Sequence, residues 1–185
     1  MSVKALTLHQ PWASLVALLV KRIETRSWST TYRGRLYIHA GARQVHSGHF
    51  LMLARAAVVA GLITREQEQA FRALAVPFGA IVASCELVDV VPIVDRKGGA
   101  VDAPTFVATF GRPAKAPALV LVRRGQTPVW TDIEGQRPYG DFTPGRFAWL
   151  LEDVRPVDPP VPCRGRQGLW TVPDDVLAQI EGAAA

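Results

Sequence analysis

The sequence predicts an α+β protein in which a small, barrel-like β-sheet is flanked by peripheral helices. Segments with strand character outnumber helical segments in the parts of the chain that carry motifs, and long irregular connections separate the strands. The chain of 185 residues has 49% hydrophobic and 20% charged residues, which is a globular composition with enough apolar mass for its own core. We therefore expect a single domain over residues 1–185, with an irregular insertion at 96–138.

The first helix is predicted to begin at Pro11, after a strand over residues 3–8. Proline suits the first position of a helix because its φ is already helical and its missing N–H has no partner there. Apolar residues then recur at the i, i+3, i+4 and i+7 spacing of a buried helical face. These residues are Trp12, Leu15, Val16 and Leu19.

An extended segment is predicted over residues 22–26, where the pattern changes to a period of two. Side chains two positions apart share one face of a strand. One face of this segment carries Arg22, Glu24 and Arg26. Ile23 and Thr25 are therefore expected on the opposite face.

The middle of the chain is predicted to contain a turn, a short buried strand, two helices and a long strand region. Gly61 separates the two helical segments, and Pro77 ends the second. The last region is rich in valine and isoleucine and forms either one long bent strand or two strands. The expected bounds are 32–35 for the turn, 36–40 for the short strand, 46–60 and 65–75 for the helices, and 80–94 for the strand region.

The C-terminal half is predicted to contain an irregular region, two strands and a final helix. Residues 95–145 are rich in glycine, proline and turn dipeptides, with one apolar run at 118–122. Four prolines between 156 and 162 argue against a central strand there, because proline cannot donate to the ladder. The other expected elements are strands at 146–151 and 167–172 and a helix at 173–180 with two aspartates in its first turn.

The charge distribution indicates a surface that faces a polyanion. The chain carries 21 basic and 16 acidic residues, and Arg is far more frequent than Lys. Residues 1–55 hold eight basic residues and one acidic residue, so this third of the chain is +7 and the remainder is −2. A GC-rich genome can explain the preference for Arg, but it does not explain the missing acids.

Several classes of protein are excluded by composition and motifs. Two cysteines, Cys85 and Cys163, form neither a disulfide framework nor a four-cysteine zinc site, and we expect no metal and no cofactor. The chain has no apolar run long enough to span a membrane. Glycine-rich phosphate loops and the Gly-x-Ser-x-Gly nucleophile elbow are also absent. These observations favour a cytoplasmic protein with no membrane partner, and they do not specify an oligomeric state.

The densest cluster of polar and aromatic side chains lies at residues 9–28. Lys21 and Arg26 are suited to hold phosphate, and an ionised Glu24 can accept protons from the donor edge of a base. Trp12 and Trp28 can stack on a base or form a wall of its pocket. The alternative is that Glu24 is paired with neighbouring cations and that both tryptophans belong to the core.

A resemblance to the ASCH domain (activating signal cointegrator homology), of the PUA-like barrel superfamily, is carried by HQPWASLV, VKRIETRSW and YRGRLYIHA. Later segments that resemble the family are GAIVASCELVDVV, YGDFTPGRFAWLLEDVRP and GRQGLW. The family signature is Gly-x-Lys-x-x-Glu-x-Arg. Lys21, Glu24 and Arg26 match this signature, but Leu19 stands at the glycine position. Because leucine adopts a positive φ only at a cost, the turn after the first helix is expected to differ.

The resemblance implies a small β-barrel with a basic cleft beside the first helix and a role in binding nucleic acid. We expect single-stranded or loop RNA as the partner. Lys21 and Arg26 would contact phosphate or an acceptor edge, and Glu24 would select a donor edge. The other residues expected at this cleft are Gln10 and His39 in its lining, Trp12 in its wall, and Arg33 and Arg146 at its flanks.

Two alternative functions are compatible with the sequence. Some ASCH relatives are ribonucleases or amidohydrolases of 4-acetylcytidine, and in a hydrolase Lys21 and Glu24 would be the catalytic pair. The amidohydrolases carry a threonine nucleophile where this chain has Glu24, and Thr25 is expected on the other face, so the sequence does not support that activity. The second alternative is an accessory module that binds a protein partner through the proline-rich surface at 155–162.

Overall fold

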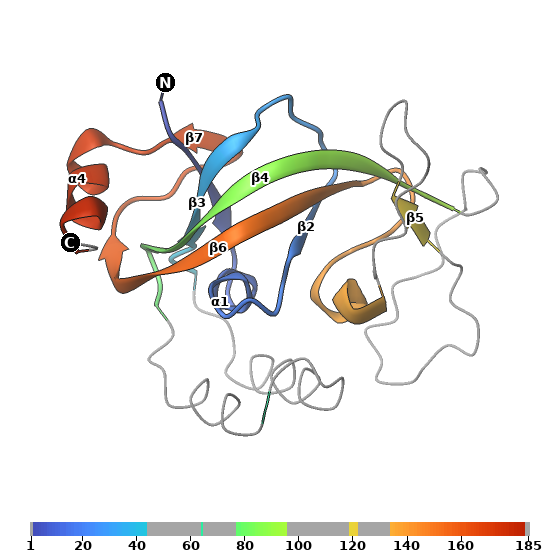
Figure 1. Cartoon of the computed structure of the whole chain (residues 1–185), viewed down its shortest axis with the longest axis horizontal. Coiled ribbons are helices and arrows are strands. Elements are labelled where there is room, and N and C mark those ends of the chain that lie inside the picture. Colours follow the sequence, from blue (N-terminus) through green and yellow to red (C-terminus); the bar gives the residue numbers. More distant parts are fainter. Residues whose placement is uncertain (1, 44–63, 65–76, 96–118, 122–133, 184–185) are drawn as a thin grey trace.

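The computed structural model describes residues 2–43, 64, 77–95, 119–121 and 134–183 (Figure 1). The helices predicted at 46–60 and 65–75 lie outside the described residues, as does most of the predicted insertion at 96–138. In chain order the elements are β1 (Lys4–Leu8), α1 (Trp12–Ala17), β2 (Ile23–Arg26), β3 (Gly34–Ala40), β4 (Ala80–Asp95), β5 (Leu119–Leu121), the 3-10 helix η1 (Glu134–Tyr139), β6 (Phe147–Pro162), β7 (Leu169–Thr171) and α4 (Asp174–Ala183).

The fold is mostly sheet with a few helices, as the sequence predicts. The strand order is β2-β6-β4-β3-β1-β7, and β5 pairs with the end of β4. β1 and β3 run parallel, whereas the other pairs are antiparallel. The predicted closure into a barrel is not confirmed, because no pairing within the described residues joins β2 to β7. A side chain crosses part of this gap, since Arg26 Nη2 of β2 donates to the Thr7 carbonyl of β1 at 3.0 Å.

The two longest strands, β4 and β6, run side by side through the molecule (Figure 1). β4 is one continuous strand of 16 residues rather than two, and irregularities in its pairing with β6 accommodate its bend. The proline-rich segment at 156–162, where the prolines argue against a central strand, forms the C-terminal part of β6. β2 pairs only with residues 147–150 of β6, so the prolines lie where β6 has a single neighbour and fewer N–H groups are needed.

The sheet buries side chains on both faces, in the alternation that a strand imposes. On β1, Leu6 and Leu8 pack into the larger cluster, which includes Trp149 and the inner side of α1. Ala5, between them, packs into the second cluster under α4 with Trp170. Figure 1 places α4 at one end of the sheet, beside the C-terminal end of β6, and α1 below β4 and β6. This arrangement leaves the C-terminal end of α1 near β2, where the candidate site forms.

The end of α1 differs from the sequence prediction. The helix stops at Ala17, and Leu19 is 49% exposed instead of buried, with φ 64°. The amide of Leu19 bonds the Val16 carbonyl at 2.9 Å, and the amide of Val20 bonds the Leu15 carbonyl at 3.0 Å. These two bonds define a Schellman motif, whose left-handed position is normally a glycine. Leu19 therefore occupies a left-handed position at which glycine is the usual residue.

Replacing Leu19 by glycine and by alanine separates backbone strain at this turn from the loss of the side chain. Both variants remove an exposed leucine, but only alanine keeps the Cβ that disfavours a positive φ. We expect Leu19→Gly to be more stable than Leu19→Ala by about 1 kcal/mol in urea unfolding. Ala17→Gly, within the helix, is the control and should be destabilised relative to the parent alanine by about 1 kcal/mol. Equal stability of the two Leu19 variants would contradict strain at this turn.

Candidate functional site

A cavity of about 240 Å³ lies beside α1 and is lined by segments far apart in the sequence. We call it the Trp12–Glu24 cavity. One part of its lining comes from α1, the following turn and β2, and the other part comes from η1 and the residues after it. The lining residues are Trp12, Lys21, Glu24, Thr25, Pro138, Tyr139, Gly140 and Asp141.

Lys21 is buried in the wall of this cavity with only 1% of its side chain exposed. Its Nζ donates to the carbonyls of Ile23 at 2.7 Å and Tyr139 at 2.6 Å, and it forms an ion pair with Glu24 Oε2 at 3.1 Å. An ammonium group has three N–H donors, so each has an acceptor within the protein. Burial lowers the pKa of Lys21, and the charge of Glu24 partly offsets this effect. The geometry therefore favours a positioning role for Lys21 over the expected contact with phosphate.

Glu24 is the acidic group of the cavity, with 9% of its side chain exposed. Its Oε1 lies 3.1 Å from Arg26 Nε, while Oε2 faces Lys21. An ionised carboxylate has about four lone-pair positions, so two cations leave acceptor capacity for a ligand. Glu24 is therefore paired with its neighbours, as one interpretation of the sequence expects, and it also lines a cavity. Its contact with a base stays a prediction.

Thr25 also lines the cavity, although the alternation along β2 places it on the opposite face of the strand from Glu24. Its Oγ1 accepts a hydrogen bond from the Asp141 amide at 2.9 Å. β2 is the last strand in the sheet order of the described residues, and hydrogen bonds link η1 and the residues after it to β2 and to the turn before it. Gln136 shows this contact directly, since its Oε1 accepts from the Arg22 amide at 2.8 Å and its Nε2 donates to the Val20 carbonyl at 3.0 Å. Side chains from both faces of an edge strand can therefore border one cavity.

Gly140 allows this close approach. A Cβ at this position would lie 3.1 Å from Thr25 Oγ1 and 2.9 Å from Phe142 Cε2. Sequence reasoning missed the whole segment at 136–141 because its low apolar content assigned it to the irregular region. The resemblance of YGDFTPGRF to the ASCH family was the signal that could have identified it.

The structure brings together only some of the residues expected at the cleft. Trp12 forms a wall, with its ring centroid 5.9 Å from Lys21 Nζ. Arg26 and Arg146 each contact a residue of the cavity lining. Arg26 Nε lies 3.1 Å from Glu24 Oε1, and Arg146 Nε lies 3.3 Å from Asp141 Oδ2. Trp28, half-buried, packs edge-on against the core residue Trp149 and does not line the cavity.

Three other expected residues lie elsewhere. Gln10 is buried and serves the helix start, because its Oε1 accepts from the Ser14 amide at 3.2 Å and its Nε2 donates to the Pro77 carbonyl at 2.7 Å. Arg33 forms an ion pair with Asp89 at 3.0 Å. His39 packs edge-on against Trp170 at the other side of β1. Gln10, Arg33 and His39 therefore lie outside the cavity lining.

The described residues offer this site neither a cluster of metal ligands nor a reactive Cys85 thiol. No cluster of three or more potential metal ligands occurs in the described residues. Cys85 is buried, donates to the Leu36 carbonyl, and has its pKa raised to about 12 by burial, so its thiol is unreactive. Among the helices of the described residues, none has the length and hydropathy that a membrane crossing requires.

The chain belongs to the ASCH domain family, whose model matches residues 6–107. Activating signal cointegrator 1 of Homo sapiens is 56% identical over 39 residues, and its Mus musculus counterpart is 54% identical over 39 residues. Each of these matches covers 21% of this chain and 7% of the relative. Among solved structures, ASCH from Zymomonas mobilis is 15% identical with a TM-score of 0.46, over 98% of this chain and 94% of that one. A mutant form of the same Zymomonas mobilis protein is 14% identical with a TM-score of 0.46, over 98% of both chains.

The Lys21–Glu24 pair predicts a stability difference that depends on pH. In Glu24→Gln the carboxylate no longer raises the pKa of Lys21, so this pKa falls further below its ordinary value of 10.5. The unfolded chain then binds more protons than the folded one, and folding stability increases with pH in this window. We expect a loss of about 3 kcal/mol near pH 7 that shrinks as the pH approaches 10.

The measurement is urea unfolding of Glu24→Gln and the parent protein at several pH values. Glu86→Gln is the matched control, since Glu86 faces Arg35 at 3.9 Å in a solvent-exposed pair. That control should lose less than about 1 kcal/mol. A loss in Glu24→Gln that is equal at every pH would contradict the coupling to Lys21.

Proposed function

We propose that this protein binds single-stranded or loop RNA and takes one unstacked nucleobase into the Trp12–Glu24 cavity. The observation that carries the proposal is a nearly buried carboxylate with free acceptor capacity beside an indole ring. The cavity volume of about 240 Å³ is below the range of about 300–1,000 Å³ typical of sites for drug-sized ligands, so it suits a base better than a longer molecule. Membership of the ASCH family, which is PUA-like and often linked to RNA binding, supports the same class of partner.

The cavity offers two kinds of contact to a base. The Trp12 ring provides an apolar surface for stacking, which is sequence-tolerant. Glu24 supplies acceptors only, so it favours a base edge that presents amino or imino protons. Selectivity among bases then depends on Glu24. Lys21 contributes to this selectivity indirectly, because it fixes the Glu24 carboxylate through Oε2.

The rim of the cavity offers cations to the backbone of the same RNA. Arg26 has 26% of its side chain exposed while it holds Glu24, and Arg146 has 29% exposed while it holds Asp141. A guanidinium group has five N–H donors, so each retains donors for a phosphate oxygen. We therefore expect Arg26 and Arg146, and not Lys21, to contact phosphate at the cavity.

A second candidate function is hydrolysis of RNA or of a modified nucleoside. It is favoured by one observation, the presence of Thr25, Lys21 and Glu24 in the lining of one cavity. Nucleophilic catalysis uses a hydroxyl group together with an amine whose pKa is lowered, and groups of both kinds line this cavity. Thr25 would then be the nucleophile and Lys21 the proton acceptor, which departs from the pair expected from the sequence.

Substitutions in the cavity wall should change RNA affinity and base preference separately. Trp12→Leu removes the stacking surface, and we expect affinity to fall about 5- to 150-fold for all bases. Glu24→Gln adds donors and removes charge, so it should weaken the preferred base by about 1–3 kcal/mol and change the order of preference. The measurement is fluorescence anisotropy with labelled single-stranded RNA homopolymers.

Trp28→Leu is the control, because it removes a half-buried indole that lies outside the cavity lining. Its affinity should match that of the parent protein once thermal unfolding confirms folding. If Trp12→Leu and Trp28→Leu bind alike, the base does not enter this cavity. Product analysis of the same mixtures tests the second candidate: cleavage or deacylation by the parent protein, lost in Thr25→Val with RNA binding retained, would establish a hydrolase.

A further inference from the structure

We propose that a second surface, formed by Arg43, Arg164 and Arg166, binds the phosphates of the RNA strand whose base enters the cavity. We call this surface the basic edge. The inference rests on the proposed function and extends it from one nucleotide to a longer stretch of backbone.

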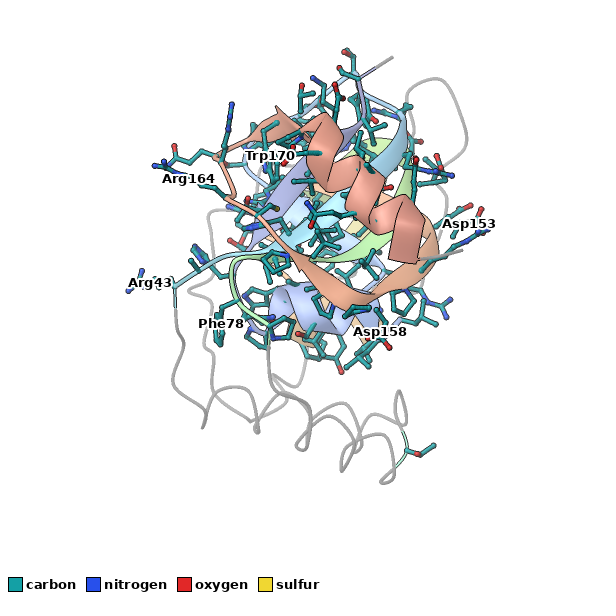
Figure 2. The ribbon with its side chains drawn as sticks, turned by 90° about the vertical axis from the view of Figure 1, so that its left-hand side faces the viewer. Arg43, Phe78, Asp153, Asp158, Arg164 and Trp170 are labelled. Atoms are coloured by element: carbon teal, nitrogen blue, oxygen red, sulfur yellow. The ribbon has the colours of Figure 1, made fainter. Side chains whose placement is uncertain are left out.

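The basic edge forms where three segments meet at the carboxyl ends of β1 and β3. These strands are parallel neighbours, so the residues that follow them emerge at the same edge of the sheet, and the Gly41 amide bonds the Leu8 carbonyl at 2.8 Å. The loop between β6 and β7 reaches the same place, because Thr7 Oγ1 donates to the Arg166 carbonyl at 2.9 Å. Figure 2 shows Arg43 and Arg164 extending outward on one side of the molecule.

The three arginines of the basic edge are exposed. Within the described residues, none of their side chains forms an ion pair or a hydrogen bond. Four arginines on or beside the strands differ, because each of them faces a carboxylate; these are Arg26, Arg33, Arg35 and Arg146. Like charges that gather at one edge without forming ion pairs among the described residues create a positive potential, and a polyanion is the ligand that relieves it.

The loop that carries two of these arginines is held in place by His39. Its Nε2 lies 3.1 Å from the Cys163 carbonyl, at the start of the loop. Gly165 lies directly on the imidazole ring, since a Cβ there would fall 2.3 Å from His39 Cε1 and 2.9 Å from Thr7 Oγ1. Because Gly165 separates Arg164 from Arg166, this contact fixes the backbone from which both side chains project.

His39 is therefore a positioning residue for the loop and not the pocket residue expected from the sequence. Burial lowers its pKa, which favours the neutral ring, so His39 adds no positive charge beneath the basic edge near neutral pH.

A chain of contacts through Arg26 connects the basic edge with the Trp12–Glu24 cavity. The Arg26 side chain contacts Glu24 Oε1 at 3.1 Å and donates to the Thr7 carbonyl at 3.0 Å. Thr7 in turn donates to the Arg166 carbonyl. An RNA strand with one base against Glu24 can therefore extend its neighbouring phosphates past Arg26 onto the basic edge.

The test compares the salt dependence of RNA binding between two double variants with the same loss of charge. Arg164→Gln/Arg166→Gln removes two cations of the basic edge. Arg35→Gln/Arg155→Gln removes two exposed arginines near the opposite end of β3. The probe is a labelled single-stranded oligouridine long enough to extend beyond the cavity, titrated at several salt concentrations. Each phosphate contact on a single strand contributes about 0.7 to the slope of log K against log salt.

We expect the slope of Arg164→Gln/Arg166→Gln to fall in magnitude by about 1.4, and that of the control to stay within about 0.3 of the parent protein. A mononucleotide, which occupies only the cavity, should bind both variants and the parent protein equally. If both double variants retain the parent slope, the basic edge does not bind phosphate. If the Arg164/Arg166 variant also loses mononucleotide binding, its effect reaches the cavity and the separate surface is rejected.

The failure of the proposed function gives a different result. In that case the parent protein binds neither the oligouridine nor other RNA homopolymers, or Trp12→Leu binds as well as Trp28→Leu. Either outcome removes the basis of the inference. If Trp12→Leu weakens RNA binding as expected but Arg164→Gln/Arg166→Gln keeps the parent salt slope, only the inference about the basic edge is overturned.

Discussion

A buried ammonium group requires acceptors for its protons, and this requirement organises the candidate site. Lys21 meets it with one carbonyl from β2, one carbonyl from η1 and the carboxylate of Glu24. The two carbonyls belong to Ile23 and Tyr139, far apart in the sequence, so one side chain joins the N-terminal and C-terminal parts of the cavity. The same contacts fix Glu24 and keep the Tyr139 backbone at the cavity wall. The recognition chemistry proposed here therefore depends on a residue that need not touch the ligand.

The delivery of Lys21 into the interior depends on the turn that ends α1. The Schellman bonds at Leu19 and Val20 reverse the chain, and the Lys21 amide bonds the Leu15 carbonyl at 2.9 Å. Leu19 is accepted at a position where glycine is the usual choice because its side chain extends into solvent. The backbone strain at this position is a local cost, which the buried contacts of Lys21 offset.

The cavity and the basic edge share one design feature, a glycine packed directly on a functional side chain. Gly140 lies against Thr25 at the cavity, and Gly165 lies against His39 beneath the arginines. In both places the missing Cβ lets a distant loop approach a strand closely. Arg26 joins the two places, because its guanidinium group contacts Glu24 on one side and β1 on the other.

The sequence by itself determined the positions of β1 to β4 and β7, the start of β6, the C-terminal helix and the local grouping of Lys21, Glu24 and Arg26, because these follow from periodicity and short spacing. Only the tertiary structure decided that β2 is an edge strand whose two faces border one cavity, and that the segment at 136–141 completes it. It also placed His39 under an arginine loop and Gln10 at a helix start. These assignments depend on partners far away in the chain, about which local patterns carry no information, since a buried polar group takes its role from the acceptors that folding brings to it.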